Sequence, residues 1–193
     1  MITGLALYYV FSKISWSQVT NLLINAKPLF LILSMVFFTL SKITSALRLQ
    51  LFFKNIQLFI SHKFNLKLAW IGMFYNLFLP GGVGGDGYKV YLLHKQKRIK
   101  VKLLIQAMLL DRVSGLVSLL ILAGVGFLLL DQSVFPEWVW YTDLLCLLLV
   151  VPSFYLVVKI LFKTFEKPAL RSLVWSIGVQ LMQVVSAILI LAA

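Results

Sequence analysis

The chain has 193 residues, of which 61% are hydrophobic and 12% are charged, and its mean hydropathy is +0.98. A soluble globular domain of this size does not carry so much apolar surface, so the composition predicts an integral membrane protein. Eighteen Lys and Arg against six Asp and Glu give a net charge of +12. In a membrane protein, an excess of basic residues mainly indicates which segments face the cytoplasm. We expect no nucleic-acid partner, because no soluble basic face is evident.

The chain begins with an apolar stretch. Residues 1–11 contain no basic residue, so they lack the charged start of a cleavable signal peptide. As a helix they reach about 16 Å, roughly half of the hydrocarbon core. We expect a span over about 1–14 in thin membrane, or a chain whose true start is missing. Residues 12–27 then predict an amphipathic helix on the outer membrane surface.

Longer apolar stretches predict four further transmembrane helices: about 28–47, 103–130, 138–160 and 172–193. The first of them begins at Pro28, which is tolerated in the first turn of a helix. A polar connection is predicted over 48–67. Most of the basic residues fall in this connection or in 89–102 and 159–171, and we place all three segments on the cytoplasmic side.

The stretch from Asn76 to Leu93, NLFLPGGVGGDGYKVYLL, holds five glycines and Pro80 between two apolar runs. Residues 68–80 reach only about 20 Å as a helix, which is too short for a full crossing. The basic clusters before and after them also belong on one side of the membrane. We therefore predict a re-entrant hairpin over 68–93, which enters the bilayer, turns at the glycines and returns. Irregular backbone at that depth needs shielding, so the turn should be a polar place lined by protein.

Nucleotide, metal and catalytic sites are not indicated. Gly82, Gly84 and Gly87 satisfy G-x-G-x-x-G, but Pro80 interrupts the strand that a dinucleotide fold needs before it. The two histidines have no Cys or His neighbour at ligand spacing. No Ser–His–Asp set is evident. We therefore expect no metal and no cofactor, and a protein that is not an enzyme.

Four ionisable residues fall in the predicted membrane segments: Lys42, Asp86, Asp111 and Arg112. A charge at that depth costs roughly 2.5–3.5 kcal/mol, so it is usually paired or functional. Asp111 and Arg112 are neighbours on one helix and point about 100° apart, so each needs a partner elsewhere. The simplest arrangement pairs Asp86 or Asp111 with Arg112 or Lys42 across helices.

These groups leave three interpretations open. They form a buried pair that only holds the hairpin to the bundle, they line a polar pocket for an anionic headgroup with Arg112 as a bidentate phosphate partner, or they reach to water. The glycine turn is either a tight hairpin or a nest of backbone N–H groups for an anion, with Asp86 as the N-cap of the return helix. The residues of the candidate headgroup pocket are Lys42, Asn76, Gly81, Gly82, Gly84, Gly85, Asp86, Asp111 and Arg112.

A basic run follows the hairpin and consists of Lys95, Lys97, Arg98, Lys100 and Lys102. A run of this kind is most often a cytoplasmic contact to anionic lipid, at about 1 kcal/mol per charge. The entrance of a lipid pathway is the sharper alternative, and a protein partner could also bind here.

The hairpin, the basic run and the later charged pair together resemble a known family. They are similar to the flippase-like membrane domain of lysylphosphatidylglycerol synthases and their stand-alone relatives. The shared features are an asparagine, a Leu-Pro before a glycine cluster, a Gly-Gly-Asp step, a Tyr-Leu-Leu return helix and an acidic–Arg pair before a glycine. In this chain these are Asn76, Leu79–Pro80, Gly84–Gly85–Asp86, Tyr91–Leu92–Leu93 and Asp111–Arg112. The resemblance implies a polytopic inner-membrane protein that moves or handles lipids. The aminoacyl-transfer domain of the synthases and a second, late glycine-rich element are not evident, so lysine transfer is not expected and the chain is compatible with a truncated or abbreviated member.

We therefore predict one all-α domain over 1–193, a polytopic transmembrane helical bundle with a glycine-broken re-entrant hairpin, in the cell (inner) membrane. The leading hypothesis is a flippase-like lipid translocase for an anionic or glycosylated lipid, with membrane lipids as partners. The alternatives are a non-transporting scaffold or partner subunit that binds a protein through its cytoplasmic basic loops, and a truncated inactive relative. A membrane enzyme acting on a lipid-linked sugar would have only Asp86 and Asp111 as candidate carboxylates.

Overall fold

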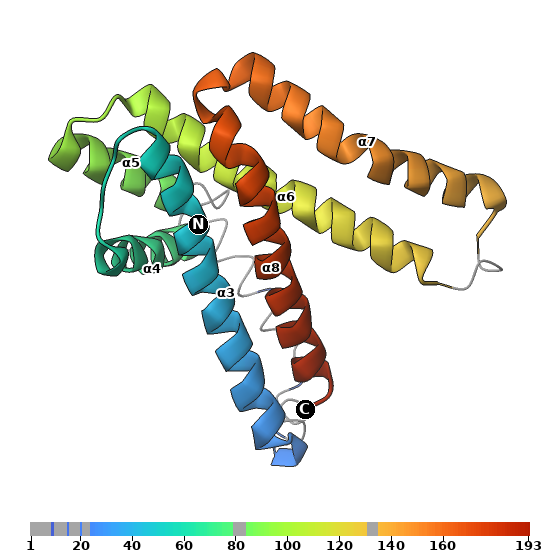
Figure 1. Cartoon of the computed structure of the whole chain (residues 1–193). Coiled ribbons are helices and arrows are strands. Elements are labelled where there is room, and N and C mark those ends of the chain that lie inside the picture. The colour runs from blue at the N-terminus through green and yellow to red at the C-terminus, as the bar shows by residue number, and fades with distance from the viewer. Residues whose placement is uncertain (1–8, 10–14, 16–19, 21–23, 79–83, 131–134) are drawn as a thin grey trace.

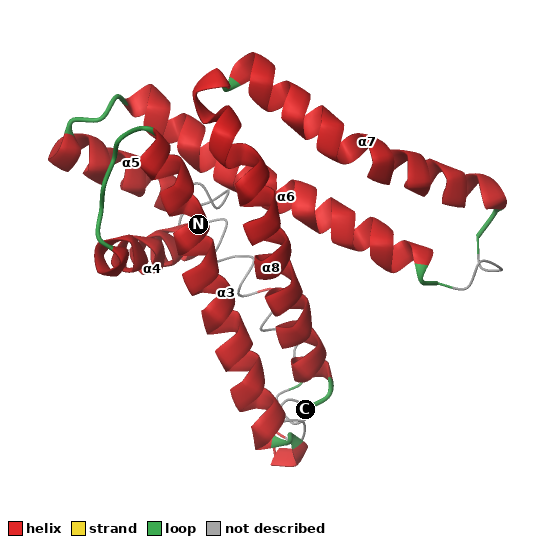
Figure 2. Cartoon of the chain, viewed as in Figure 1, coloured by secondary structure: helices red, strands yellow, loops and turns green. Residues whose placement is uncertain are grey.

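The computed structural model describes residues 9, 15, 20, 24–78, 84–130 and 135–193. Within these ranges the chain forms helices joined by short connections and contains no strand (Figure 2). This confirms the predicted all-α fold. Apart from residue 9, the predicted span 1–14 lies outside the described residues, and so do ten of the sixteen residues of the predicted surface helix 12–27. Residues 79–83, where the turn with Pro80, Gly81 and Gly82 is predicted, also lie outside them.

The described helices are α3 (Pro28–Asn55), α4 (His62–Phe78), α5 (Gly84–Lys97), α6 (Val101–Leu128), α7 (Glu137–Leu161), the 3-10 turn η3 (Lys163–Phe165) and α8 (Glu166–Leu191) (Figure 1). Four stretches are long and apolar enough to cross a membrane, namely α3, α6, α7 and the continuous segment Lys163–Leu191. They contain most or all of the four predicted spans, so the prediction of a helical transmembrane bundle is confirmed.

The first of these helices is longer than predicted. α3 continues through Arg48 to Asn55, and α4 already begins at His62, so the polar connection expected over 48–67 is wrong. The prediction ended the helix at a charge, but Arg48 is buried within the bundle and bound by a carboxylate of another helix. The true connection covers only residues 56–61, and it begins with Ile56 at the helix end and Gln57 in a left-handed conformation, φ 58°.

α3 and α8 lie side by side and run in opposite directions (Figure 1). At one end the Lys27 N–H donates to the Ala193 carbonyl at 2.7 Å. Further along, the Ser186 hydroxyl donates to the Ser34 carbonyl at 2.9 Å. At the other end the side-chain amide of the last residue of α3, Asn55, donates to the carbonyl of Thr164. This pair forms the long axis against which the other helices pack.

The apolar core lies at the end of the bundle where α3 ends and α8 begins. Phe52, Phe53 and Phe165 are fully buried there, together with Leu93 near the end of α5 and Leu104 near the start of α6. The rings of Phe52 and Phe165 meet edge to face, with their centroids 6.0 Å apart. Away from this core the long helices expose large apolar side chains over much of their length, as lipid-facing helices do.

Candidate functional site

α4 and α5 form an antiparallel hairpin, and a glycine on each helix lets their backbones meet. A Cβ atom added at Gly85 would come within 2.0 Å of the carbonyl oxygen of Gly72, so only glycine fits there. The Gly85 N–H donates to the side-chain oxygen of Asn76 at 2.8 Å. Asn76 of α4 therefore satisfies one of the free N–H groups at the start of α5, and the prediction that gave this capping role to Asp86 is wrong.

Asp86 instead joins the hairpin to α6. Its carboxylate accepts hydrogen bonds from Nε of Arg112, on α6, and from Nζ of Lys89, one turn along α5, the latter at 3.2 Å. The Asp86 side chain is 15% exposed and that of Arg112 is 44% exposed. The Asp86–Arg112 pair is one of the pairings that the sequence left open, and it holds the start of α5 against the middle of α6.

A second ion pair lies deeper in the bundle. The guanidinium of Arg48 donates from Nε and Nη2 to the two carboxylate oxygens of Asp111, at 2.8 and 3.0 Å, and from Nη1 to the hydroxyl of Ser176 at 2.7 Å. The side chain of Arg48 is only 6% exposed. One residue thus bridges α3, α6 and α8 in the bidentate geometry that makes such pairs strong.

This pairing corrects the partner predicted for Asp111. The sequence offered Arg112 or Lys42, whereas the structure gives Arg48, which the prediction had placed in a polar loop. Gly115 lies beside it, because a Cβ there would be in ordinary contact with Nη1 of Arg48, at 3.4 Å. The glycine that follows the acidic–Arg pair in the family motif therefore lies next to the buried guanidinium, where a methyl group would also fit.

Lys42 lines a cavity of about 130 Å³ between α3, α4, α5 and α6. The lining residues are Lys42, Ser45, Ala46, Leu49, Leu66, Ala69, Trp70, Met73, Lys89 and Asp111. Within the described ranges Lys42 makes no ion pair, and its amine lies 4.7 Å from the centroid of the Phe38 ring. Asp111 is already bound to Arg48, and Asp86 is shared between Arg112 and Lys89. The region therefore carries an excess of positive charge, which favours an anion.

The remaining predicted site residues separate into two groups. Gly84 is the first residue of α5, while Gly81 and Gly82 lie outside the described residues. The basic run is exposed at the turn between α5 and α6 and consists of Lys95, Lys97, Arg98, Lys100 and Lys102. Arg98 ends α5 in a left-handed conformation, φ 54°, and its N–H donates to the carbonyl of His94 at 2.9 Å. The structure thus leaves the run free to face a membrane surface.

Sequence reasoning missed three residues of the cluster. Arg48 could have been found only by continuing the helix through it, since no local pattern names its partner. Lys89 was counted only as one of the basic residues that follow the segment 68–80. Its stem crosses α4 so closely that a Cβ at Gly72 would come within 2.4 Å of its Cε. Gly72 gave no signal of its own, because an isolated glycine in an apolar run has many explanations.

Asp143, on α7, is a further acid in a candidate span that the sequence reasoning overlooked. It lines a cavity of about 600 Å³ between α6 and α7. One of its carboxylate oxygens and the indole nitrogen of Trp140 are buried, and neither has a hydrogen-bond partner in the described part of the chain. Over the same residues no group of three or more His, Cys, Asp or Glu side chains could hold a metal ion.

Long apolar helices, an antiparallel hairpin and ion pairs between the helices define a helical membrane protein with charged groups inside its bundle. The chain belongs to the family described as the lysylphosphatidylglycerol synthase TM region, whose model matches residues 1–193. The family predicted from the sequence is therefore confirmed. No curated protein and no solved structure matches the chain.

Proposed function

We propose that this chain is a flippase-like lipid translocase of the cell (inner) membrane, and that it binds the anionic head of a lipid at the cavity around Lys42. The observation that carries the proposal is Lys42, a cation that has no carboxylate partner among the described residues and lies in a helix long and apolar enough to cross the membrane. A charge at membrane depth is costly, and a bound phosphate would offset that cost. The cavity is far smaller than the roughly 300–1,000 Å³ of typical small-molecule sites, so it would admit part of a headgroup, with the acyl chains left outside.

The hairpin contacts support a re-entrant loop at this place. Asp86, next to the turn, is bound to Arg112, which lies 11 residues after Val101, the first residue of α6. That separation corresponds to about 16 Å along the helix, roughly half of the hydrocarbon core. A hairpin that enters beside the start of α6 would therefore turn near the middle of the bilayer and carry Lys89 with it.

Binding is better supported than catalysis. The candidate carboxylates, Asp86 and Asp111, are each bound to an arginine, Arg112 and Arg48, so neither is left unpaired to act on a substrate. The exposed basic run at the α5–α6 turn suits an anionic leaflet on the cytoplasmic side. We therefore propose membrane lipids as partners and no enzymatic reaction.

A lipid translocation assay tests this function. The purified chain is placed in vesicles with a fluorescent phosphatidylglycerol, and the fraction of label that becomes accessible from outside is followed with time. We expect Lys42→Gln to slow this movement about tenfold or more, which corresponds to about 1.4 kcal/mol, and Lys42→Arg to retain most of it. Lys63→Gln is the matched control, because Lys63 is an exposed lysine of α4 that lines none of these cavities. Equal rates for Lys42→Gln and Lys63→Gln would contradict the proposed headgroup site.

A further inference from the structure

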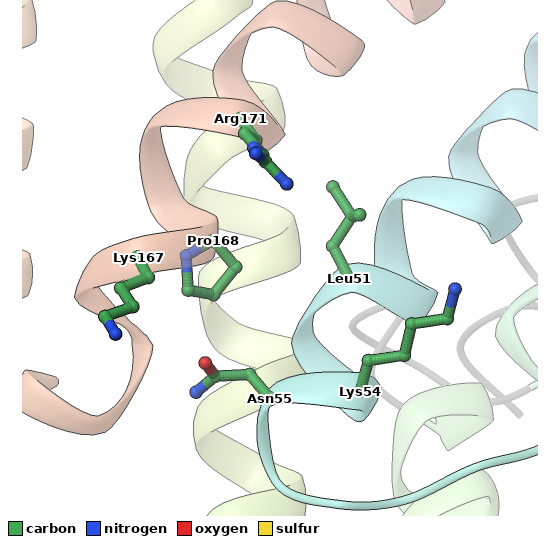
Figure 3. Close-up of a pocket in the computed structure, with 6 residues that line it drawn as sticks. All are labelled: Leu51, Lys54, Asn55, Lys167, Pro168 and Arg171. Atoms are coloured by element: carbon green, nitrogen blue, oxygen red, sulfur yellow. The ribbon is translucent and has the colours of Figure 1, made fainter.

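A second basic cavity, of about 570 Å³, lies between the end of α3 and the start of α8 (Figure 3). It is lined by Leu51, Lys54, Asn55, Lys167, Pro168 and Arg171. In Figure 3 Arg171 extends from α8 toward α3, whereas the amines of Lys54 and Lys167 extend outward on opposite sides of the cavity. Each amine ends a flexible four-carbon stem, so both lysines can turn toward a group bound at the mouth.

None of the three cations of this cavity forms an ion pair with a described residue. The acid nearest in sequence is Glu166, and its carboxylate accepts a hydrogen bond from the hydroxyl of Tyr155, on α7, at 2.6 Å. That bond commits Glu166 to α7, so among the described residues no carboxylate is paired with the three cations that line the cavity. An arginine with two lysines is a suitable set for a phosphate group.

Beyond the cavity, the antiparallel register of α3 and α8 places apolar residues of the two helices next to each other, and we call this stretch the seam. Asn55 meets Thr164, and Arg48 meets Ser176, so the same register sets Leu51 opposite Arg171 and Leu47 opposite Trp175. Trp175 is 40% exposed and lies one turn beyond Arg171, farther from the start of α8. Charge at the mouth and apolar side chains beyond it match an amphiphile whose acyl chains follow the seam.

We infer that this cavity is a binding site for an anionic phospholipid, separate from the headgroup site around Lys42. The phosphate lies between Arg171 and the two lysines, and the first segments of the acyl chains lie along Leu47 and Trp175. A free phosphate ion fits the same three cations, but only a lipid has acyl chains that contact the seam. Basic pockets between helices at the membrane surface are typical places for anionic lipid headgroups.

Quenching of Trp175 by brominated lipid tests this site directly. In a chain whose other four tryptophans are replaced by phenylalanine, Trp175 reports on the seam and not on the Lys42 cavity. Vesicles that contain brominated phosphatidylglycerol with unbrominated phosphatidylcholine, or the reverse, give the relative binding constant of the two lipids next to Trp175. At about 1 kcal/mol per surface cation, we expect phosphatidylglycerol to be preferred about fivefold or more, and the preference to fall to near one in Lys54→Gln/Lys167→Gln/Arg171→Gln.

A charge-matched control neutralises three other exposed lysines, Lys63, Lys67 and Lys159, and should keep the preference. The site is overturned if the parent chain shows no preference, or if the variant without the three cavity cations keeps it. Inorganic phosphate, added in excess over the lipid phosphate, is the second probe. If phosphate binds the parent chain and not the triple variant, while the parent chain shows no lipid preference, the cavity is a site for a free anion and the lipid assignment is wrong. Lys42→Gln leaves this local readout unchanged if the two sites are separate, so either proposal can fail alone.

Discussion

Gly85 gives the sharpest test of the hairpin geometry. In Gly85→Ala the new Cβ would lie 2.0 Å from the carbonyl oxygen of Gly72, and Cβ contacts under 3.0 Å essentially never occur. The two helices must therefore separate by about 1 Å. Overpacking of this kind costs about 1–3 kcal/mol, and weakening the hydrogen bond between Gly85 and Asn76 adds about 0.5–1.5 kcal/mol. The helix gains up to about 1 kcal/mol from alanine, which leaves a net loss near 2 kcal/mol.

Thermal unfolding of the purified chain in detergent measures this loss. For a chain of this size 1 kcal/mol corresponds to roughly 2–4 °C, so we expect Gly85→Ala to unfold about 4–8 °C below the parent chain. Gly87→Ala is the control, because Gly87 lies two residues along the same helix and a Cβ there meets nothing within 4 Å. That variant should unfold at the parent temperature or slightly above it.

The comparison of the two alanine variants decides the question. Both change the same residue type in the same turn of α5, so they share the change in helix propensity and differ in what the methyl group meets. If Gly85→Ala is as stable as Gly87→Ala, then α4 and α5 do not approach each other as the structure has them, and the position of Lys89 beside the Lys42 cavity loses its support.

Two further predictions concern packing inside the bundle. Asp111→Asn leaves the buried Arg48 without its counter-charge and should destabilise the chain by about 3–5 kcal/mol; the double variant with Arg48→Met should recover part of this loss, and additive losses would show that the two residues act independently. Gly124→Ala puts a Cβ 2.7 Å from the Leu147 side chain, whereas Gly126→Ala meets nothing within 4 Å. The first variant should therefore unfold at a temperature lower by the equivalent of about 1–3 kcal/mol, and equal melting temperatures would show that α6 and α7 are not packed at Gly124.

The long helices could be predicted from sequence because their signal is local. An apolar run of 20 or more residues can hardly be anything else, and the stretches around 103–130, 138–160 and 172–193 lie almost wholly within the observed helices and their flanks. The hairpin was also indicated locally, by a proline and five glycines between two short apolar runs. Its two helices are now described, while the turn itself lies outside the described residues.

The ionic cluster could be predicted only in part, because its contacts join distant residues. Asp86 and Arg112 were named as candidates from their expected depth, and the pair forms between α5 and α6. Arg48 was missed because a charge taken alone ends a predicted span, whereas a charge bound by Asp111, 63 positions later, does not. Gly72 owes its role to the Lys89 side chain of another helix, and no pattern along the chain reveals such a role.

The side of the membrane on which the hairpin begins and ends is the most direct test of the account. In a Cys146→Ser background, which removes the single native thiol, one cysteine is placed at Lys63, near the start of α4, and in a second variant at Lys95, near the end of α5. Both positions are exposed, and each is labelled in oriented vesicles with a maleimide that does not cross the bilayer. The account predicts that both thiols react from the same side. Labelling from opposite sides would mean that the hairpin crosses the membrane, and the proposed headgroup site around Lys42 would be contradicted.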